Sequence, residues 1–174
     1  METSERDVSY ELDGQLFVWN KIKAENNKMK HGISFEEAAS VFVIDGAEEF
    51  DDDEHSDYEE RLIVIGLSRE SRILTVVHCW REDDTVIRII SARKATQVEQ
   101  NFGRGDIVKA EYDLSTMKRK GHPLREKVSR GEIVLMSPLD IPNREAKLAA
   151  LPPDERAFVT EFLETYQKEK GMPV

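Results

Sequence analysis

Three apolar runs decide the fold of this chain: Arg61–Gly66 (RLIVIG), Ile73–Trp80 (ILTVVHCW) and Val86–Ser91 (VIRIIS). Each run is rich in β-branched residues, and short polar stretches at positions 68–72 and 81–85 separate them. Short polar connections between such runs are typical of antiparallel hairpins. The three runs therefore predict an antiparallel meander.

The residues before the meander predict one strand and two helices. Leu16–Trp19 is short and apolar, which is typical of a strand. Residues 20–30 have a helix-compatible composition that ends at Gly32, a residue able to stop a helix. Ser34, with Glu37 three residues later, forms a capping-box pattern that opens a second apolar helical repeat. Residues 92–102 are also helix-capable, so we expect an α+β fold with a small antiparallel sheet of about four strands and packed helices.

The stretch 45–60 is dominated by acidic residues and reads as an exposed loop. His55 lies among Asp51, Asp52, Asp53 and Asp57, and imidazole and carboxylate groups are suitable metal ligands. Their spacing matches no defined coordination geometry. We therefore predict a solvated acidic loop and no metal site.

Length and charge predict two units. The chain has 174 residues, which is enough for one domain with an appended module. Residues 1–103 have a net charge of −11 and residues 104–174 a net charge of +1. Gly103 and Gly105 flank an arginine where the composition changes. We expect a domain over 1–103 and a partly flexible extension over 104–174, which ends in a helix at 154–170 with an apolar stripe of Phe158, Phe162 and Tyr166.

Composition also restricts the function classes. The single cysteine, Cys79, lies in an apolar run, so it reads as a buried hydrophobe in a protein of the reducing cytoplasm. No apolar stretch approaches the ~20 residues of a membrane span, and the N-terminus has no signal-peptide pattern. No phosphate-binding glycine loop, zinc spacing or nucleophile triad is present, and we expect no cofactor. Because the chain has a net charge of −10, nucleic acid would need a local cationic cluster.

Spaced blocks of sequence carry a family resemblance across residues 16–102. In order, the blocks are Phe17-Val18-Trp19-Asn20, Lys30–Ala38 (KHGISFEEA), Val41-Phe42, His55 with Glu60-Arg61, Ile65–Ser68 (IGLS), Leu74–His78 (LTVVH), and Ile87–Ala95 (IRIISARKA) with Glu99. In order and spacing these blocks resemble the BrnT family of bacterial toxins. Asn20 stands where the family usually has aspartate, and Phe102 where its closing helix usually has tyrosine.

The resemblance implies a RelE-like fold and an endoribonuclease that inhibits translation. Metal-independent cleavage uses the 2′-hydroxyl of the RNA to attack the adjacent phosphate, which gives a cyclic phosphate. The implied partners are RNA and an antitoxin of the BrnA type, or the chain's own C-terminal segment. The alternative is a non-catalytic binding or regulatory module, which the missing tyrosine and the acidic charge favour.

The resemblance assigns catalytic roles to Lys30, Arg61, Arg81 and Arg93. RNA-binding roles are expected of His31, Arg88 and Lys94. Arginine and lysine can position a phosphate and stabilise its charge, and histidine can move a proton near neutral pH.

Each of these residues could instead have a purely structural role. Strand-end arginines could pair with the acids of 45–60, and Lys30 and His31 could satisfy helix-end carbonyls. Strand alternation also places Arg88 and Ser91 on opposite faces of the sheet. One surface could then hold all the predicted residues only if the strand ends bend.

The segment after the boundary carries a second, short resemblance. Residues 109–115 (KAEYDLS), with Met117 and Lys118, resemble the first residues of small antitoxins. The basic stretch 109–130 is complementary in charge to the acidic domain. We therefore weigh a fused antitoxin-like inhibitor against an unrelated extension.

Overall fold

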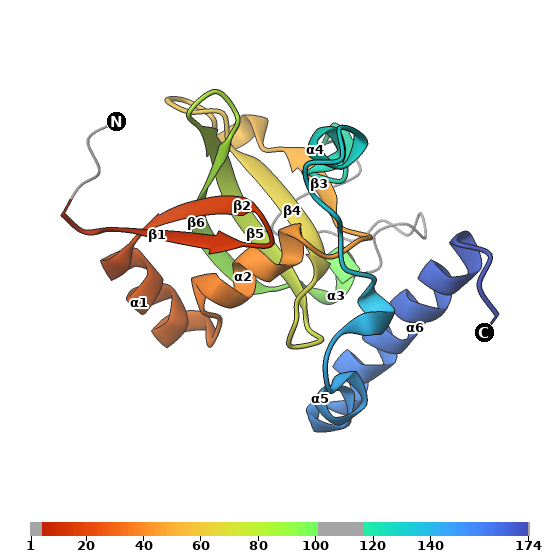
Figure 1. The fold of residues 1–174 in the computed structure, drawn as a ribbon. Coiled ribbons are helices and arrows are strands. Elements are labelled where there is room, and N and C mark those ends of the chain that lie inside the picture. The colour runs from red at the N-terminus through yellow and green to blue at the C-terminus, as the bar shows by residue number, and fades with distance from the viewer. Residues whose placement is uncertain (1–4, 101–116, 174) are drawn as a thin grey trace.

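A computed structural model describes residues 5–100 and 117–173, and its centre is a seven-stranded sheet with helices on both faces (Figure 1). The strand order is β1-β2-β6-β5-β4-β3-β7. The strands are β1 (Asp7–Leu12), β2 (Gln15–Asn20), β3 (Glu48–Asp51), β4 (Leu62–Leu67), β5 (Ile73–Arg81), β6 (Val86–Lys94) and β7 (Arg119–Gly121). The helices are α1 (Lys21–His31), α2 (Phe35–Phe42), α3 (Gln97–Gln100), α4 (Arg125–Ser129), α5 (Arg144–Ala150) and α6 (Pro153–Glu169), with 3-10 turns at Asp53–His55 and Pro138–Asp140.

The α+β class and the meander β4-β5-β6 are confirmed, whereas the expected size of the sheet is wrong. Seven strands replace about four, and the sheet is mixed because β2 pairs in parallel with β6. The first additional strand, β1, forms a hairpin with β2 through Asp13 and Gly14, whose φ angles are 50° and 85°. Two positive φ angles fit the right-handed twist of a two-residue hairpin. The remaining two, β3 and β7, pair with each other at the opposite edge.

The expectation of an exposed loop at 45–60 is wrong for its first half. Strand β3 lies in this stretch, and Glu49 and Phe50 are buried there. Phe50 joins the apolar core, and Glu49 Oε1 lies 2.7 Å from Nε2 of buried His78. A buried carboxylate needs such a partner. Packing of Phe50 and the Glu49–His78 pair together hold an acidic segment in the sheet.

Local capping sets the first two helices as expected. The Asn20 side chain accepts hydrogen bonds from the backbone N–H groups of residues 22 and 23, each at 3.1 Å, and Gly32 ends α1 with φ of 69°. The Ser34 hydroxyl accepts from the Glu37 N–H at 3.1 Å and opens α2. Within the described part of the third predicted helix, residues 92–100, only residues 97–100 are helical, because residues 92–94 still belong to β6. Phe102 lies outside the described residues.

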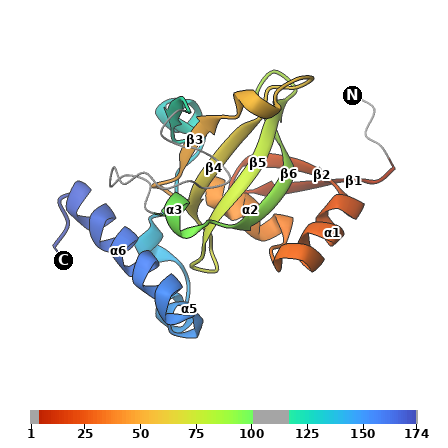
Figure 2. The same cartoon turned by 180° about the vertical axis from the view of Figure 1, so that it is seen from behind.

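The two faces of the sheet bury separate apolar clusters, and Figure 2 shows α1 and α2 well apart from α6. We call them the helix face, which packs against α1 and α2, and the tail face, which packs against α6. The C-terminal part contributes to both, since Leu124 and Ile133 join the first cluster and Val159 and Leu163 join the second. The boundary expected near residue 103 and the antitoxin-like residues 109–115 lie outside the described residues.

The helix predicted at 154–170 is present as α6. Its buried residues are Val159, Leu163 and Tyr166, while Phe158 and Phe162 are only partly buried. The stripe that contacts the sheet is therefore rotated from the one expected. The Tyr166 hydroxyl lies 2.9 Å from Asp45 Oδ2, so the helix is anchored to the segment that leads into β3.

Candidate functional site

A bulge in β6 brings the predicted arginines onto one face of the sheet. Val77 pairs with Ser91 and His78 with Ile89, which leaves Ile90 as an extra residue in β6. An extra residue shifts the alternation of the strand by one position. Residues 88 and 93, an odd number of positions apart, therefore both lie on the tail face. The expectation that Arg88 and Ser91 point to opposite faces is thus wrong.

Three of the predicted residues form a group that we call the arginine cluster: Arg61, Arg81 and Arg88. Arg88 pairs with Cys79 across the strands, and Arg81 follows two positions later on the same face of β5. Arg61 directly precedes Leu62, whose partner is His78, so Arg61 continues β4 toward the position opposite Cys79.

Glu59 is the shared acidic partner of the cluster. Its Oε2 lies 2.5 Å from Nη2 of Arg81, and its Oε1 lies 3.6 Å from Nε of Arg61. The hydrogen bond from Arg81 lowers the pKa of Glu59, so the carboxylate stays charged at neutral pH. Arg88 is held separately by Asp7 of β1, with its Nη1 at 3.2 Å from Oδ2. The ion pairing expected of strand-end arginines is therefore present, and for Arg61 and Arg81 it involves the acidic stretch.

Cys79 lies within the cluster and is not a nucleophile. Burial raises the pKa of its thiol to about 11, and its Sγ lies 3.8 Å from Glu59 Oε2. A protonated buried thiol behaves as a small apolar side chain. Its predicted role as a buried hydrophobe is confirmed by an exposed fraction of 1%.

Arg93 stands apart from the cluster. It lies opposite Thr75, six positions from Arg81 along β5, or about 20 Å at the usual strand rise. Both terminal nitrogens of Arg93 lie 2.8 Å from the Glu99 carboxylate, which also accepts from the Thr75 hydroxyl at 2.9 Å. Burial opposes the charge of Glu99, but the hydrogen bonds from Arg93, Thr96 and Thr75 lower its pKa overall. This network fixes α3 to the end of the sheet.

Lys94, Lys30 and His31 lie outside the arginine cluster as well. Lys94 Nζ lies 2.8 Å from Glu155 Oε1 of α6. Lys30 is exposed and His31 half-buried at the end of α1. Within residues 5–100 and 117–173, neither of these two side chains forms a hydrogen bond or ion pair, so neither satisfies a helix-end carbonyl there. The structure thus brings together three of the seven predicted site residues.

Sequence reasoning missed the acidic partners of the site. Glu59 was not distinguished from its neighbours in the acidic stretch, and Asp7 belongs to a strand that was not predicted. A usable signal for that strand was present, because Asp13-Gly14 is a strong hairpin signal between two alternating runs. The shared carboxylate Glu59 carries no comparable local signal.

The described residues contain no group of three or more His, Cys, Asp and Glu side chains placed to hold a metal ion. His55 instead pairs with Asp52 at 2.9 Å, and that hydrogen bond raises the pKa of His55. None of the described helices is long and apolar enough to cross a membrane.

Comparison with known proteins gives one family match, over the part of the chain that contains α1, α2 and β3–β6. Residues 19–99 match the family model described as "Ribonuclease toxin, BrnT, of type II toxin-antitoxin system". Among solved structures, the chain is similar to the 1.1 Å crystal structure of the Brucella abortus ribonuclease toxin BrnT, with 25% sequence identity and a TM-score of 0.35. The similarity covers 45% of this chain and 94% of the Brucella chain. No curated protein matches the chain. Residues 19–99, slightly under half of the 174-residue chain, therefore match the BrnT family of ribonuclease toxins.

Proposed function

We propose that this chain is a metal-independent endoribonuclease that inhibits translation and holds the scissile phosphate of RNA at the arginine cluster. The family match supports the activity. The observation that carries the site is the bulge in β6, since it sets Arg88 on the same face as Arg81 and beside Arg61. Three guanidinium groups around one strand end can bind a phosphate through several charge-assisted hydrogen bonds.

For this reaction the protein mainly needs to position the scissile phosphate and stabilise its negative charge. The 2′-hydroxyl of the RNA loses its proton and attacks the adjacent phosphorus, and the bond to the 5′-oxygen breaks. The leaving 5′-oxygen takes up a proton from water, and a 2′,3′-cyclic phosphate forms. Arg81 donates to Glu59 and, at 3.4 Å, to the carbonyl of Trp80, which leaves other N–H groups of its five for the phosphate. Charged Glu59 orients the guanidinium groups of Arg61 and Arg81 and accepts the proton of the 2′-hydroxyl.

The remaining predicted residues take supporting roles in this proposal. Lys30 and His31 contact the RNA from the edge of the sheet, beyond the cluster. Arg93 supports the site indirectly, because its guanidinium is bound to the buried carboxylate of Glu99. Lys94 becomes available to RNA only when Glu155 releases it.

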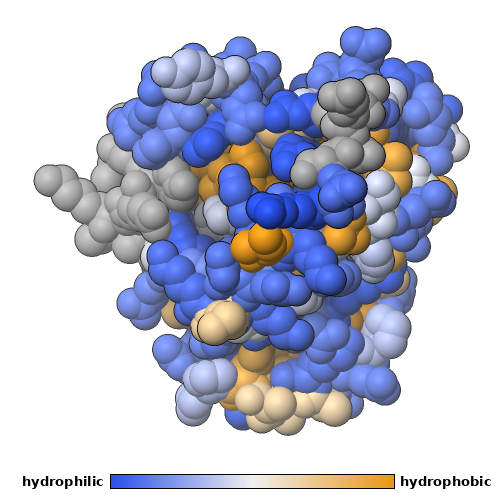
Figure 3. Space-filling model, turned by 90° about the vertical axis from the view of Figure 1, so that its left-hand side faces the viewer, coloured by the Kyte–Doolittle hydropathy of each residue, from blue (hydrophilic) through white to orange (hydrophobic). Residues whose placement is uncertain are grey.

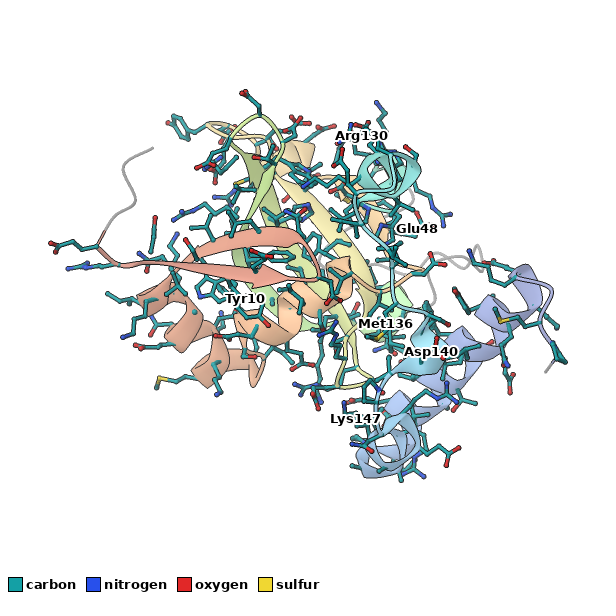
Figure 4. The ribbon with its side chains drawn as sticks, viewed as in Figure 1. Tyr10, Glu48, Arg130, Met136, Asp140 and Lys147 are labelled. Atoms are coloured by element: carbon teal, nitrogen blue, oxygen red, sulfur yellow. The ribbon has the colours of Figure 1, made fainter. Side chains whose placement is uncertain are left out.

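The test is cleavage of a labelled single-stranded RNA by the full-length chain in the presence of EDTA. We expect fragments that end in a 2′,3′-cyclic phosphate, and we expect Arg88→Ala to lose this activity. Arg130→Ala is the control, because Arg130 also pairs with a carboxylate, that of Glu132 at 2.6 Å, and lies at the end of α4, outside the arginine cluster (Figure 4). Cleavage that EDTA abolishes, or RNA that stays intact with both the wild type and the Leu163→Asp variant described below, would contradict the proposal.

A second candidate is regulation by the C-terminal segment of the same chain. Helix α6 packs on the tail face, the face that carries the arginine cluster, and Val159 and Leu163 share a core cluster with Val77 of β5. Glu155 of the same helix also neutralises Lys94. We propose that this segment, whose Glu155–Lys94 contact lies at the end of the sheet away from the arginine cluster, acts as a built-in inhibitor in place of a separate antitoxin.

This candidate is tested in the full-length chain by loosening α6. Leu163→Asp places a charge at a position that is only 7% exposed, whereas Val134→Asp makes the same kind of change at a position that is 85% exposed. Self-inhibition predicts faster RNA cleavage by Leu163→Asp than by Val134→Asp while circular dichroism shows the sheet retained. A folded Leu163→Asp variant that cleaves no faster than the control would exclude it.

A further inference from the structure

Helix α1 carries a concentration of positive charge that residues 5–100 and 117–173 do not neutralise. Lys21, Lys23, Lys28 and Lys30 are all exposed. Within residues 5–100 and 117–173, none of their side chains forms an ion pair or hydrogen bond. The helix has four lysines against one glutamate, Glu25, in a chain of net charge −10. The arginines of β4–β6 and their connections are, by contrast, paired with carboxylates.

The lysines form two parallel rows along the helix. At 100° per residue, Lys23 and Lys30 lie on one flank of α1, and Lys21 and Lys28 lie on the other. The two members of each row are seven residues apart, or about 10.5 Å along the axis. Buried Asn27 marks the inner side of the helix, so both rows border its exposed side. Two rows of separated charges fit an extended polyanion better than a single anion.

Contacts of Asn27 place this helix beside the strand that carries two of the predicted arginines. Its Nδ2 lies 2.8 Å from the Ala92 carbonyl, and its Oδ1 accepts from the Ala92 N–H at 3.0 Å. Helix α1 therefore lies along the edge of β6, the strand of Arg88 and Arg93. The side of the molecule on which α1 lies is mostly hydrophilic, with small separate hydrophobic areas (Figure 3).

We propose that α1 binds the phosphate backbone of the RNA and guides the RNA chain across the edge of β6 toward the arginine cluster. This inference rests on the proposed ribonuclease function. Lysine contacts to phosphate give affinity without sequence preference, and they matter most in a protein whose overall charge repels nucleic acid. The exposed apolar residues of the helix, Ile22 and Met29, are two isolated side chains and supply no groove for a folded protein partner.

The test measures binding of a fluorescent single-stranded RNA to the full-length chain as a function of salt. The double variant Lys23→Gln, Lys30→Gln is compared with Lys118→Gln, Lys168→Gln, which removes the same charge at two exposed lysines outside α1. We expect the α1 variant to bind about tenfold more weakly or worse. Its slope of log affinity against log salt should become shallower by about 0.7 for each RNA phosphate that the variant no longer neutralises. The control variant should match the wild type in both respects.

Each result of this experiment separates the inference from the proposed function. Equal loss of affinity in the two variants, or no loss in either, overturns the role of α1 even if the wild type cleaves RNA. Loss confined to the α1 variant supports it even if the wild type does not cleave. A poly-glutamate probe of equal charge tests the other class of partner: if α1 substitutions weaken that complex and leave RNA binding unchanged, α1 is a surface for acidic protein segments and the RNA assignment fails.

Discussion

The side-chain amide of Asn27 satisfies both backbone groups of Ala92, which lies beyond the stretch where β2 pairs with β6. The same amide also donates to the Ile33 carbonyl at 3.0 Å. One buried side chain thus closes the open half of a sheet edge and fixes α1 against it. An exposed strand edge would otherwise invite pairing with another chain.

We expect Asn27→Ala to lower the free energy of unfolding by about 2–4 kcal/mol, since it leaves two or three buried backbone groups without partners. Asn26→Ala is the matched control, because Asn26 is the preceding residue of the same helix and its side chain is exposed. Urea unfolding measures both variants. Equal stability of the two variants would show that Asn27 is not what holds the edge.

Breaking the Arg93–Glu99 pair should affect stability more than breaking the Arg81–Glu59 pair. Removing Arg93 leaves the carboxylate of Glu99, whose side chain is 0% exposed. Removing Arg81 leaves the carboxylate of Glu59, whose side chain is 29% exposed. Loss of the charged partner of a buried carboxylate costs about 3–5 kcal/mol, while a partly exposed pair contributes about 1 kcal/mol or less. Urea unfolding of Arg93→Ala and Arg81→Ala should show this order, and the reverse order would contradict the network described for Glu99.

His122 makes the docking of the segment after β7 sensitive to acid. Its Nε2 donates to the Ile44 carbonyl at 3.0 Å, and its Nδ1 accepts from the Leu124 N–H at 3.1 Å, so the ring is bound in its neutral form. Burial lowers the pKa of His122, although Asp45, Glu48 and Glu49 oppose this shift. The unfolded chain therefore binds the proton more readily than the folded chain.

The stability supplied by this histidine is present above pH 6.5 and is lost as the pH falls through the lowered pKa of the folded state. We expect the melting temperature of the wild type to fall between pH 7.5 and pH 5.5 by more than that of His122→Gln, which has no titrating ring. Thermal unfolding at both pH values checks this. Parallel behaviour of the two proteins would remove His122 as the cause.

Local signals predicted the elements that depend on local interactions. The β-branched runs predicted β4, β5 and β6, and the caps at Ser34 and Gly32 predicted where α2 begins and α1 ends. Strands β3 and β7 were not predictable in this way. Their sequences, EEFD and RKG, are polar and become strands only because they pair with β4 and with each other.

The candidate site shows the same division between local and tertiary information. Arg61, Arg81 and Arg88 were identified from sequence, but strand alternation gave the wrong face for residues beyond the bulge. Residue Ile90 continues the apolar pattern of β6 without interruption, so the sequence carries no mark of the extra residue. Only the register with β5 determines which side chains share a surface, and only the fold brings Glu59 between two arginines.

The most direct test of the account compares RNA cleavage by Arg81→Ala and Arg69→Ala in the full-length chain. The two arginines are closely matched, because their side chains are 27% and 30% exposed and each binds a carboxylate at 2.5 Å. Arg69, however, lies in the β4–β5 connection and not in the arginine cluster. If the cluster binds the scissile phosphate, Arg81→Ala cleaves about 100-fold more slowly or worse, as expected for loss of a charge-stabilising donor, while Arg69→Ala cleaves at the wild-type rate. Equal cleavage rates for the two variants would contradict the assignment of the site.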